Sequence, residues 1–344
     1  EVMEASGSNR LMLFHQPFII RVAEALPHAD VLLGKPMPVA AAAAFYRELG
    51  DTTFDHARQL RWLVDTPERV QQYAQLAEQL GQAMQVCIEL DVGLHRGGVH
   101  TDSDLLALLD GITASSHLQF AGFMGYEPHV AKAASKLEGL VNPAVGFTAE
   151  LLRDWAMAEY THYVNLARSH LGEQWPEDAL LNCGGSPTYQ LYDQGDFPFN
   201  ELAAGSCLVK PTDFDIVSLA DQVAASFIAT PVLKTPYRKQ LPVAPVGPLQ
   251  SIWDPNRERT VFTYGGYWKA EPVSPAGLSV NSLYGRSTNQ EMLNGSDATG
   301  LSVDDWVFLR PTQSEFVFLQ FGDIAVYDNG AISEYWPVFG QDAT

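Results

Sequence analysis

The sequence predicts an α/β protein: a (β/α)8 barrel of the TIM type that lacks its first unit, followed by a C-terminal antiparallel β domain. As far as about residue 209, short apolar runs alternate with longer amphipathic runs, which indicates parallel strands joined by helical crossovers. Beyond Lys210-Pro211 the runs become short and β-rich, and turn residues separate them. We therefore place a boundary near residue 210, with residues 1–210 in the barrel domain and 211–344 in the β domain.

The barrel domain contains seven predicted strands, Arg10–Phe14, Val31–Leu33, Leu60–Val64, Gln85–Leu90, Gln119–Gly122, Leu180–Cys183 and a run near Gly205–Val209. Apolar residues at spacings of three and four predict helices between them, for example at Pro67–Leu80, Asp102–Ala114 and Val145–Leu171. A complete barrel has eight strands in about 250 residues, so roughly one βα unit is missing.

Glycine and polar residues follow most of these strands, at Gly34-Lys35, Asp65-Thr66, Asp91-Val92-Gly93, Gly125-Tyr126 and Gly184-Gly185-Ser186. Barrels and open α/β sheets both place their chemistry at the carboxyl ends of the strands. These positions are therefore where we expect a functional site.

The β domain is predicted from six short runs, Val243–Val246, Thr260–Tyr264, Gly277–Val280, Trp306–Arg310, Glu315–Leu319 and Ile324–Tyr327. Turn signals separate them at Asp254-Pro255-Asn256, Gly265-Gly266, Asn294-Gly295 and Asp328-Asn329-Gly330. Asn329-Gly330, between Ile324–Tyr327 and Ile332–Trp336, predicts a β-hairpin.

The composition excludes several classes of protein. The 344 residues include 41 Asp and Glu against 21 Lys and Arg, which gives a net charge of −20 and a pI of about 4.7. Nucleic acids and anionic membranes would repel such a chain, so neither is expected as a general partner. No stretch reaches the ~18 apolar residues of a membrane helix. Three cysteines without a CxxC pattern favour a reduced, cytoplasmic protein.

One segment carries a family resemblance. Glu89–Val99 reads ELDVGLHRGGV and resembles the ExDxGxHRxGV signature of the alanine-racemase-like barrel enzymes of fold type III, which use pyridoxal phosphate. The chain is most similar to the D-threonine aldolase and D-serine dehydratase branch of that group. Further matches follow in the family's order at Gly125-Tyr126, Gly184–Thr188, Glu201–Ser206 and Phe308–Pro311, so the resemblance covers essentially the whole chain.

The resemblance implies two sets of site residues. A phosphate needs converging backbone N–H groups and hydroxyls, and the candidates to bind it are Gly184, Gly185, Ser186, Thr188, Gly205 and Ser206. Arg96 and Tyr126 are expected to line the cofactor ring, with Arg96 anchoring an anionic group or shifting the pKa of a neighbour. Glu127 and His129 are candidates for an acid/base pair, whereas His95 is equally well explained as a packed structural histidine.

The expected metal site departs from the family pattern. In this branch a metal is usually bound by a Pro-Asn-His-x-Cys motif, whereas this chain has Pro311-Thr-Gln313-Ser-Glu315. Glutamine is a poor zinc ligand and a carboxylate is a hard one. Manganese or magnesium bound through Glu315 stays open, but a divalent metal is doubtful and we expect a protein without one.

The cofactor lysine is the second departure. The family holds pyridoxal phosphate as a Schiff base on a lysine that ends the first barrel strand, and none of the seven lysines of this chain occupies that place. We expect that the chain begins inside the family's barrel, so that the lysine lies on a segment outside this sequence. The alternative is a family member that has lost the lysine.

The resemblance implies a homodimeric pyridoxal phosphate enzyme, a lyase or racemase, whose substrate is a small D-amino acid or hydroxy amino acid. Aldol cleavage, dehydration with deamination, and racemisation all stay open. A competing hypothesis is a non-catalytic protein that binds pyridoxal phosphate or another phosphorylated ligand with the same fold. A third is a barrel hydrolase that uses Asp91 and Glu127.

Overall fold

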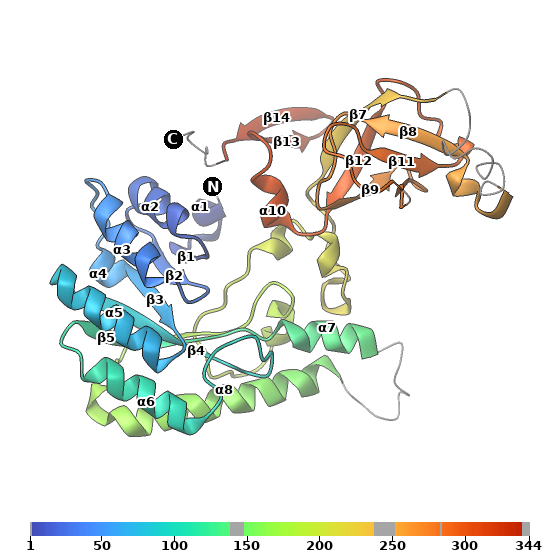
Figure 1. Ribbon diagram of the computed structural model, residues 1–344. Helices are drawn as coiled ribbons and strands as arrows, with labels where there is room; N and C mark the ends of the chain where they lie inside the picture. The colour runs from blue at the N-terminus through green and yellow to red at the C-terminus, as the bar shows by residue number, and fades with distance from the viewer. Residues whose placement is uncertain (1, 138–147, 237–251, 283, 339–344) are drawn as a thin grey trace. The chain divides into compact units, whose positions relative to one another are not determined.

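The computed structural model describes residues 2–137, 148–236, 252–282 and 284–338. The chain divides into two compact units (Figure 1). The first comprises Glu1–Gly205 with Ile216–Ser218, and the second comprises Ser206–Asp215 with Leu219–Thr344. Each unit is described by itself below.

A parallel sheet of six strands forms the centre of the first unit. Its strands are hydrogen-bonded in sequence order, β1 to β6, and comprise β1 (Arg10–Leu13), β2 (Asp30–Leu33), β3 (Leu60–Val64), β4 (Met84–Leu90), β5 (Leu118–Gly125) and β6 (Leu180–Asn182). An isolated parallel bridge joins Asn182 to Glu201 beyond β6. Because each strand pairs with the next in the chain, the sheet is a partial TIM-type barrel, which confirms the predicted fold class.

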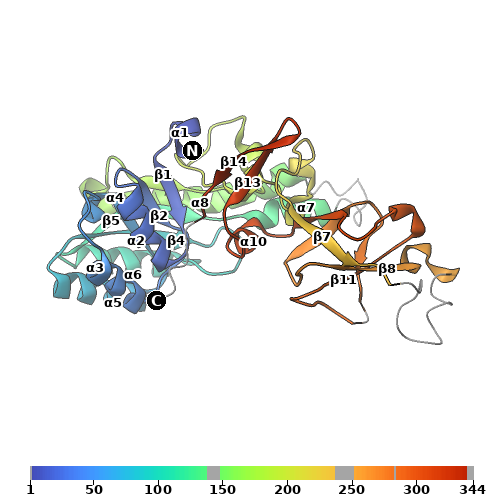
Figure 2. The same ribbon diagram turned by 90° about the horizontal axis from the view of Figure 1, so that it is seen from above.

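Helices follow these strands, and Figures 1 and 2 show α5, α6 and α8 alongside the sheet. The helices of this unit are α1 (Val2–Ser6), α2 (Gln16–Ala25), α3 (Val39–Glu48), α4 (His56–Gln59), α5 (Pro67–Leu80), α6 (Asp102–Thr113), α7 (Pro128–Leu137) and α8 (Ala149–Leu171). Threonine hydroxyls accept a backbone N–H at the first turns of α5, α6 and α8, which explains where these helices begin. None of the described helices is long and apolar enough to cross a membrane.

The apolar core of the first unit lies between the sheet and these helices. Trp62 of β3, Tyr73 of α5 and Tyr160 of α8 are fully buried within it. The Trp62 ring nitrogen donates to the Tyr46 hydroxyl at 2.9 Å, so this buried polar group has a partner. The carboxyl ends of the strands are thereby held on a packed framework.

An antiparallel sheet forms the second unit. It has the strand order β10-β11-β8-β7-β12-β9 and comprises β7 (Ile228–Lys234), β8 (Arg259–Thr263), β9 (Ala270–Ser274), β10 (Ser279–Val280), β11 (Met292–Gly295) and β12 (Trp306–Pro311). The predicted hairpin is confirmed as β13 (Ile324–Asp328) and β14 (Ala331–Trp336). Asn329 and Gly330 both have positive φ, 48° and 90°, as a two-residue hairpin turn requires.

Short helices complete the described chain. One is α10 (Ser314–Phe318). The others are single 3-10 turns at Gly172–Gln174, Tyr189–Tyr192, Ser206–Leu208, Thr212–Phe214, Val217–Leu219, Pro255–Arg257 and Asp297–Thr299.

Three local predictions are wrong. The run near Gly205–Val209 is a 3-10 turn, and the chain meets β6 earlier, at Glu201. Glu315–Leu319 lies largely in helix α10, which buries Ser314 and Val317, three residues apart. Asn294-Gly295 ends strand β11 instead of forming a turn. The predicted run Val243–Val246 lies outside the described residues.

Candidate functional site

The candidate site lies in the first unit, at the carboxyl ends of β4, β5 and β6. These three strands are neighbours in the sheet, so the loops that follow them start side by side. The motif residues Asp91–Val99 and Cys183–Thr188 occupy the loops after β4 and β6. Tyr126 and Glu127 lie between β5 and helix α7, and His129 is in the first turn of that helix. Each predicted site residue of this unit therefore follows a strand end, apart from Gly205.

Asp91 organises the loop after β4. Its Oδ1 accepts the backbone N–H groups of Gly93 at 3.0 Å and His95 at 2.9 Å, and its Oδ2 lies 2.9 Å from His95 Nδ1. Burial acts to raise the pKa of Asp91, but the hydrogen bonds from His95 and Gly93 outweigh it and hold this pKa below its ordinary value. The His95 side chain is 81% exposed, so the packed structural histidine, one of the two explanations left open, is wrong.

The same loop folds back on β4. Val99 N–H donates to Glu89 O at 2.8 Å, and Asp91 N–H donates to Val99 O at 2.9 Å. Gly98 has a φ of 93°, and a Cβ there would lie 2.7 Å from the Asp91 nitrogen. Only glycine, which has no Cβ, allows this close approach. The fold-back therefore fixes the position of the backbone at Arg96.

Arg96, Tyr126 and Gly185 meet, although they come from three different loops. The guanidinium carbon of Arg96 lies 5.1 Å from the centre of the Tyr126 ring, a cation–π arrangement. A Cβ on Gly185 would come within 2.6 Å of Tyr126 Cε2, so the ring packs directly against this glycine. The structure thus brings together the two predicted ring-lining residues and one residue of the predicted phosphate loop.

Glu89 is a titratable group of this site that was not among the predicted site residues. It is 7% exposed, and its Oε1 lies 4.0 Å from Arg96 Nη2. Burial raises the pKa of Glu89 to about 7, against the opposing effect of Arg96 and with smaller contributions from Asp65 and Asp91. Its signal in the sequence was its place as the first residue of the ExDxGxHRxGV match.

The predicted phosphate loop divides into two groups. Gly184 N–H and the Thr188 hydroxyl donate to the Glu127 carboxylate at 3.0 and 2.6 Å, and Gly185 N–H donates to Thr188 Oγ1 at 3.2 Å. These three residues therefore bond within the protein.

Ser186 and Gly205 form the other group. Ser186 Oγ accepts Gly205 N–H at 3.1 Å, so two segments 19 residues apart meet there. No atom lies within 4 Å of the position that a Cβ on Gly205 would take. Ser206 belongs to the second unit, where its hydroxyl bonds to the Glu315 carboxylate.

A cavity of about 500 Å³ adjoins the Arg96–Tyr126 pair. Leu94, His129 and Lys132 are among its lining residues, and none of those residues is acidic. Burial lowers the pKa of His129, although Glu127 and Asp91 act to raise it. Glu127 and His129 thus face different surroundings: Glu127 bonds to the loop after β6, and His129 lines the cavity.

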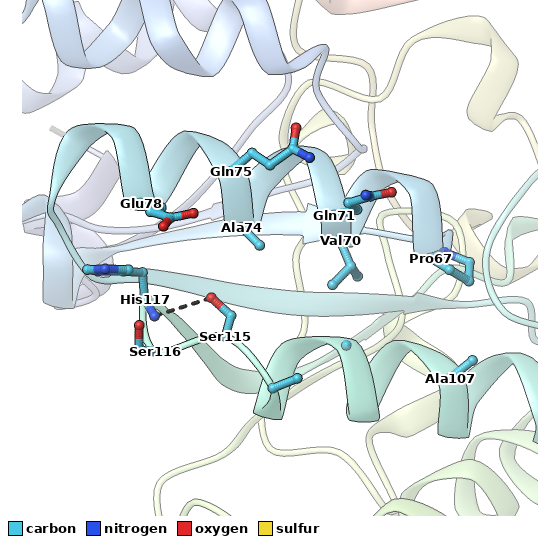
Figure 3. A pocket seen from close by; sticks show the side chains of 12 residues that line it. Pro67, Val70, Gln71, Ala74, Gln75, Glu78, Ala107, Ser115, Ser116 and His117 are labelled. Atoms are coloured by element: carbon cyan, nitrogen blue, oxygen red, sulfur yellow. Dashed lines mark hydrogen bonds between the residues drawn. The ribbon is translucent and has the colours of Figure 1, made fainter.

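A second cavity, of about 460 Å³, lies between α5 and α6 (Figure 3). Its walls include Gln71, Gln75, Glu78 and His117. Its lining runs from Pro67, at the start of α5, to His117, immediately before β5, so this cavity is a groove along two helices. Because barrel chemistry occurs at the carboxyl ends, we assign the candidate site to the first cavity.

The predicted metal position lies in the second unit. The Gln313 side chain accepts from Lys269, and the Glu315 carboxylate accepts from Ser206. Among the described residues no group of three or more His, Cys, Asp and Glu side chains is arranged to hold a metal ion. The expectation about metal stays a prediction.

The described lysines are dispersed. Lys35 follows β2 and Lys132 lies on α7, both in the first unit and both exposed. In the second unit, Lys210 is buried and donates to Gln222 O at 2.5 Å. Phe14 and His15 follow β1 directly. No cofactor lysine is therefore assigned in the described part of the chain.

A partial barrel of parallel strands, a strand-end site with the HRxGV arginine and a C-terminal antiparallel unit define a protein of the fold type III pyridoxal phosphate class. The chain belongs to the family described as alanine racemase, N-terminal domain, whose model matches residues 2–212. No curated protein matches the chain.

Solved structures show the same fold. The D-threonine aldolase from Filomicrobium marinum is 14% identical with a TM-score of 0.70, and the alignment covers 97% of this chain and 82% of that one. The D-threo-3-hydroxyaspartate dehydratase from Delftia sp. HT23 is 16% identical with a TM-score of 0.62, covering 98% and 92%. An alanine racemase-like protein from Idiomarina loihiensis is 18% identical with a TM-score of 0.67, covering 98% and 87%.

Proposed function

We propose that the protein is a pyridoxal-phosphate-dependent enzyme that acts on a D-amino acid or a hydroxy amino acid. The observation that carries the proposal is the meeting of Arg96, Tyr126 and Gly185 at three neighbouring strand ends. An aromatic face, a fixed cation and a glycine loop are the groups that a phosphorylated aromatic cofactor needs. The family to which the chain belongs uses this cofactor.

The residues at the strand ends fit a phosphate in part. The Ser186 hydroxyl and Gly205 lie together, and the space over Gly205 is open. Gly184, Gly185 and Thr188 are committed to internal hydrogen bonds. We therefore propose that the Ser186 hydroxyl, which accepts Gly205 N–H and keeps its own hydrogen to donate, binds the phosphate in the open space over Gly205. The other three residues shape the loop. Ser206 remains a proposed contributor.

Two groups near the Arg96–Tyr126 pair suit the expected reaction. When bound, pyridoxal phosphate withdraws electrons from the carbon where the substrate reacts. Glu89, with a pKa of about 7, holds or releases a proton at neutral pH close to Arg96. Arg96 and Lys132, on the wall of the cavity, attract the carboxylate of an amino-acid substrate.

Two of the similar structures support a hydroxy amino acid as the substrate. By their names they are an aldolase for D-threonine and a dehydratase for D-threo-3-hydroxyaspartate, and both of these substrates carry a hydroxyl on the β-carbon. Aldol cleavage and dehydration are therefore the proposed reactions, and racemisation is the alternative. We also propose that the protein is a homodimer, that it is located in the cytoplasm and that it binds no metal.

The test is cofactor binding by the full-length protein. We expect added pyridoxal phosphate to give visible absorbance that borohydride fixes to a lysine, and peptide mapping then identifies that lysine. Aldehyde or keto-acid release from D-threonine and D-serine reports the activity, and light scattering reports the oligomeric state. Absence of any cofactor binding would overturn the proposal.

One observation favours the non-catalytic alternative. Among the described residues, the lysine that lines the cavity, Lys132, lies on helix α7 and does not end a strand. Reversible binding of pyridoxal phosphate that borohydride does not fix, together with no turnover, would assign the protein to this alternative.

A further inference from the structure

Among the described residues of the first unit, Glu127 is the buried carboxylate that the proposed function leaves without a role. It follows Tyr126 in the chain, and it is 0% exposed. No basic side chain of the described residues forms an ion pair with it. A buried carboxylate without a cation must be satisfied by hydrogen-bond donors.

Four donors satisfy it, two on each oxygen. Oε1 accepts from the Thr188 hydroxyl at 2.6 Å and the Tyr192 hydroxyl at 3.0 Å, and Oε2 accepts from Gly184 N–H at 3.0 Å and Cys183 Sγ at 3.3 Å. A carboxylate has about four acceptor positions, so its capacity is used. All four donors belong to residues 183–192, and Glu127 alone comes from the end of β5.

This arrangement controls the shape of the loop after β6. Gly184 has a φ of 83°, and a Cβ there would lie 2.7 Å from Leu202 Cδ1, so the backbone is held in a conformation that favours glycine. Thr188 donates to Glu127 and accepts Gly185 N–H, which extends the network to the glycine against Tyr126. The conformation of residues 184 and 185 therefore depends on Glu127.

The donors stay protonated. Burial raises the pKa of Tyr192, and the nearby Glu127 raises it further. Burial and Glu127 likewise raise the pKa of Cys183 well above its ordinary value. At neutral pH the hydroxyl and the thiol keep their hydrogens, so the network is not interrupted by titration of these two groups.

We propose that Glu127 is a positioning residue: an anion within the chain that fixes the 183–192 loop so that Ser186 stands beside Gly205 and Gly185 supports the Tyr126 ring. Its functional consequence rests on the proposed function, whereas its effect on the loop does not. Glu127 differs in this from a catalytic acid or base, because none of its acceptor positions is left for a substrate.

The first experiment is hydrogen exchange on the chain without ligand. We expect the backbone amides of residues 183–189 to exchange about tenfold faster or more in Glu127→Ala, the effect of losing a hydrogen bond to a charged group. Formate is a carboxylate small enough for the vacated space, and adding it should restore protection. Unchanged protection in a folded Glu127→Ala protein would overturn the proposal.

Glu127→Gln covers the case in which the alanine variant does not fold. The amide oxygen must face Gly184 N–H, so the NH2 group faces the hydroxyls of Thr188 and Tyr192, which then accept. The Thr188 hydroxyl has another acceptor at 3.4 Å, Gly185 O. We therefore expect an intermediate loss of protection, confined to residues 188–192. Equal loss along the whole loop would contradict this assignment of the atoms.

Glu291→Gln is the matched control. Glu291 is also buried, at 1% exposed, and it lies in the second unit, where it pairs with Arg286 and accepts Tyr267 N–H. Its replacement removes a buried carboxylate of the same size without touching the 183–192 loop. Faster exchange of that loop in Glu291→Gln would show a general loss of stability and would overturn the assignment to Glu127.

The second experiment compares pyridoxal phosphate with pyridoxal. We expect Glu127→Ala to weaken pyridoxal phosphate binding by about 10–100-fold, as loss of a supporting residue does, and to weaken pyridoxal much less. Equal weakening of both would contradict a role through the phosphate donors. If the unmodified chain binds neither ligand, the proposed function fails while the exchange result still decides the role of Glu127 in the loop.

Discussion

The guanidinium of Arg96 lies against the Tyr126 ring, with 5.1 Å between the guanidinium carbon and the ring centre. The two residues follow neighbouring strands, β4 and β5, and Gly185 after β6 supports the ring. Arg96 is also 4.0 Å from the Glu89 carboxylate. The cation is therefore shared between an aromatic face and a carboxylate whose pKa is raised by burial to about 7.

Gly185→Ala is expected to displace the Tyr126 ring. The added methyl group would lie 2.6 Å from Tyr126 Cε2, so ring or loop must move, and overpacking of this kind costs about 1–3 kcal/mol. We expect pyridoxal phosphate binding, measured by calorimetry, to weaken about tenfold or more. Gly322→Ala in the second unit is the control, because no atom lies within 4 Å of its added methyl. Similar binding by both variants would contradict the packing.

Gly98→Ala and Gly97→Ala test the fold-back of the loop after β4. Gly98 has positive φ and its Cβ would lie 2.7 Å from two backbone atoms, whereas a Cβ on Gly97 meets only Asp65 Oδ2, at 4.0 Å. We expect Gly98→Ala to lower the free energy of unfolding by more than about 2 kcal/mol and Gly97→Ala by less than about 0.5 kcal/mol. Urea denaturation measures both, and equal losses would refute the geometry.

Glu89 makes stability depend on pH. Burial raises its pKa from 4.5 to about 7, so between these values the folded chain binds a proton that the unfolded chain has released. Its contribution to the free energy of unfolding is therefore present at low pH and is lost as pH rises through this window. We expect the free energy of unfolding of Glu89→Gln to rise, relative to that of the unmodified chain, by up to about 3 kcal/mol between pH 4.5 and 8.

Urea denaturation at several pH values measures this gain. Glu177→Gln, at an exposed position, is the control and should follow the unmodified chain throughout. If the free energies of unfolding of Glu89→Gln and of the unmodified chain differed by the same amount at every pH, Glu89 would be ionised across the window, which would contradict the raised pKa.

Two cysteines are expected to be inert in the folded protein. Burial raises the pKa of Cys87 to about 12, and burial together with Glu127 raises that of Cys183 well above its ordinary value. Thiolates are the reactive form, so iodoacetamide should leave both unmodified at pH 7.5 and alkylate both in guanidinium chloride. Peptide mass spectrometry measures the alkylation of each cysteine. Rapid labelling of either residue in the folded protein would contradict the prediction and show that the structure around that residue opens.

The barrel strands were predictable because their apolar runs are continuous and their ends are polar. Strands β7 and β9 were not found, since Pro231 and Pro272 interrupt them and proline argues against a strand. Asn294 looked like a turn residue, but its amide donates to Arg259 O and Thr260 Oγ1 in the adjacent strand. Such tertiary contacts outweigh the local turn preference.

The site was predictable to the level of its motifs. Arg96, Tyr126 and Gly185 were named from the family pattern, and they meet in the structure. The division of the phosphate loop was not predictable, because it depends on Glu127, which comes from another strand. The raised pKa of Glu89 was likewise hidden, since it results from burial by residues far apart in the sequence.

The local concentration of a carboxylate that belongs to the chain does not depend on the solution. Glu127 reaches the donors of the 183–192 loop at a fixed effective concentration, whereas a loop organised by a dissolved anion would change shape with the composition of the medium. Dialysis against water of low ionic strength should therefore leave this loop as ordered as it is in phosphate buffer. Glu127 is thus the anion that organises the glycine loop, and the order of this loop does not depend on the ions in solution.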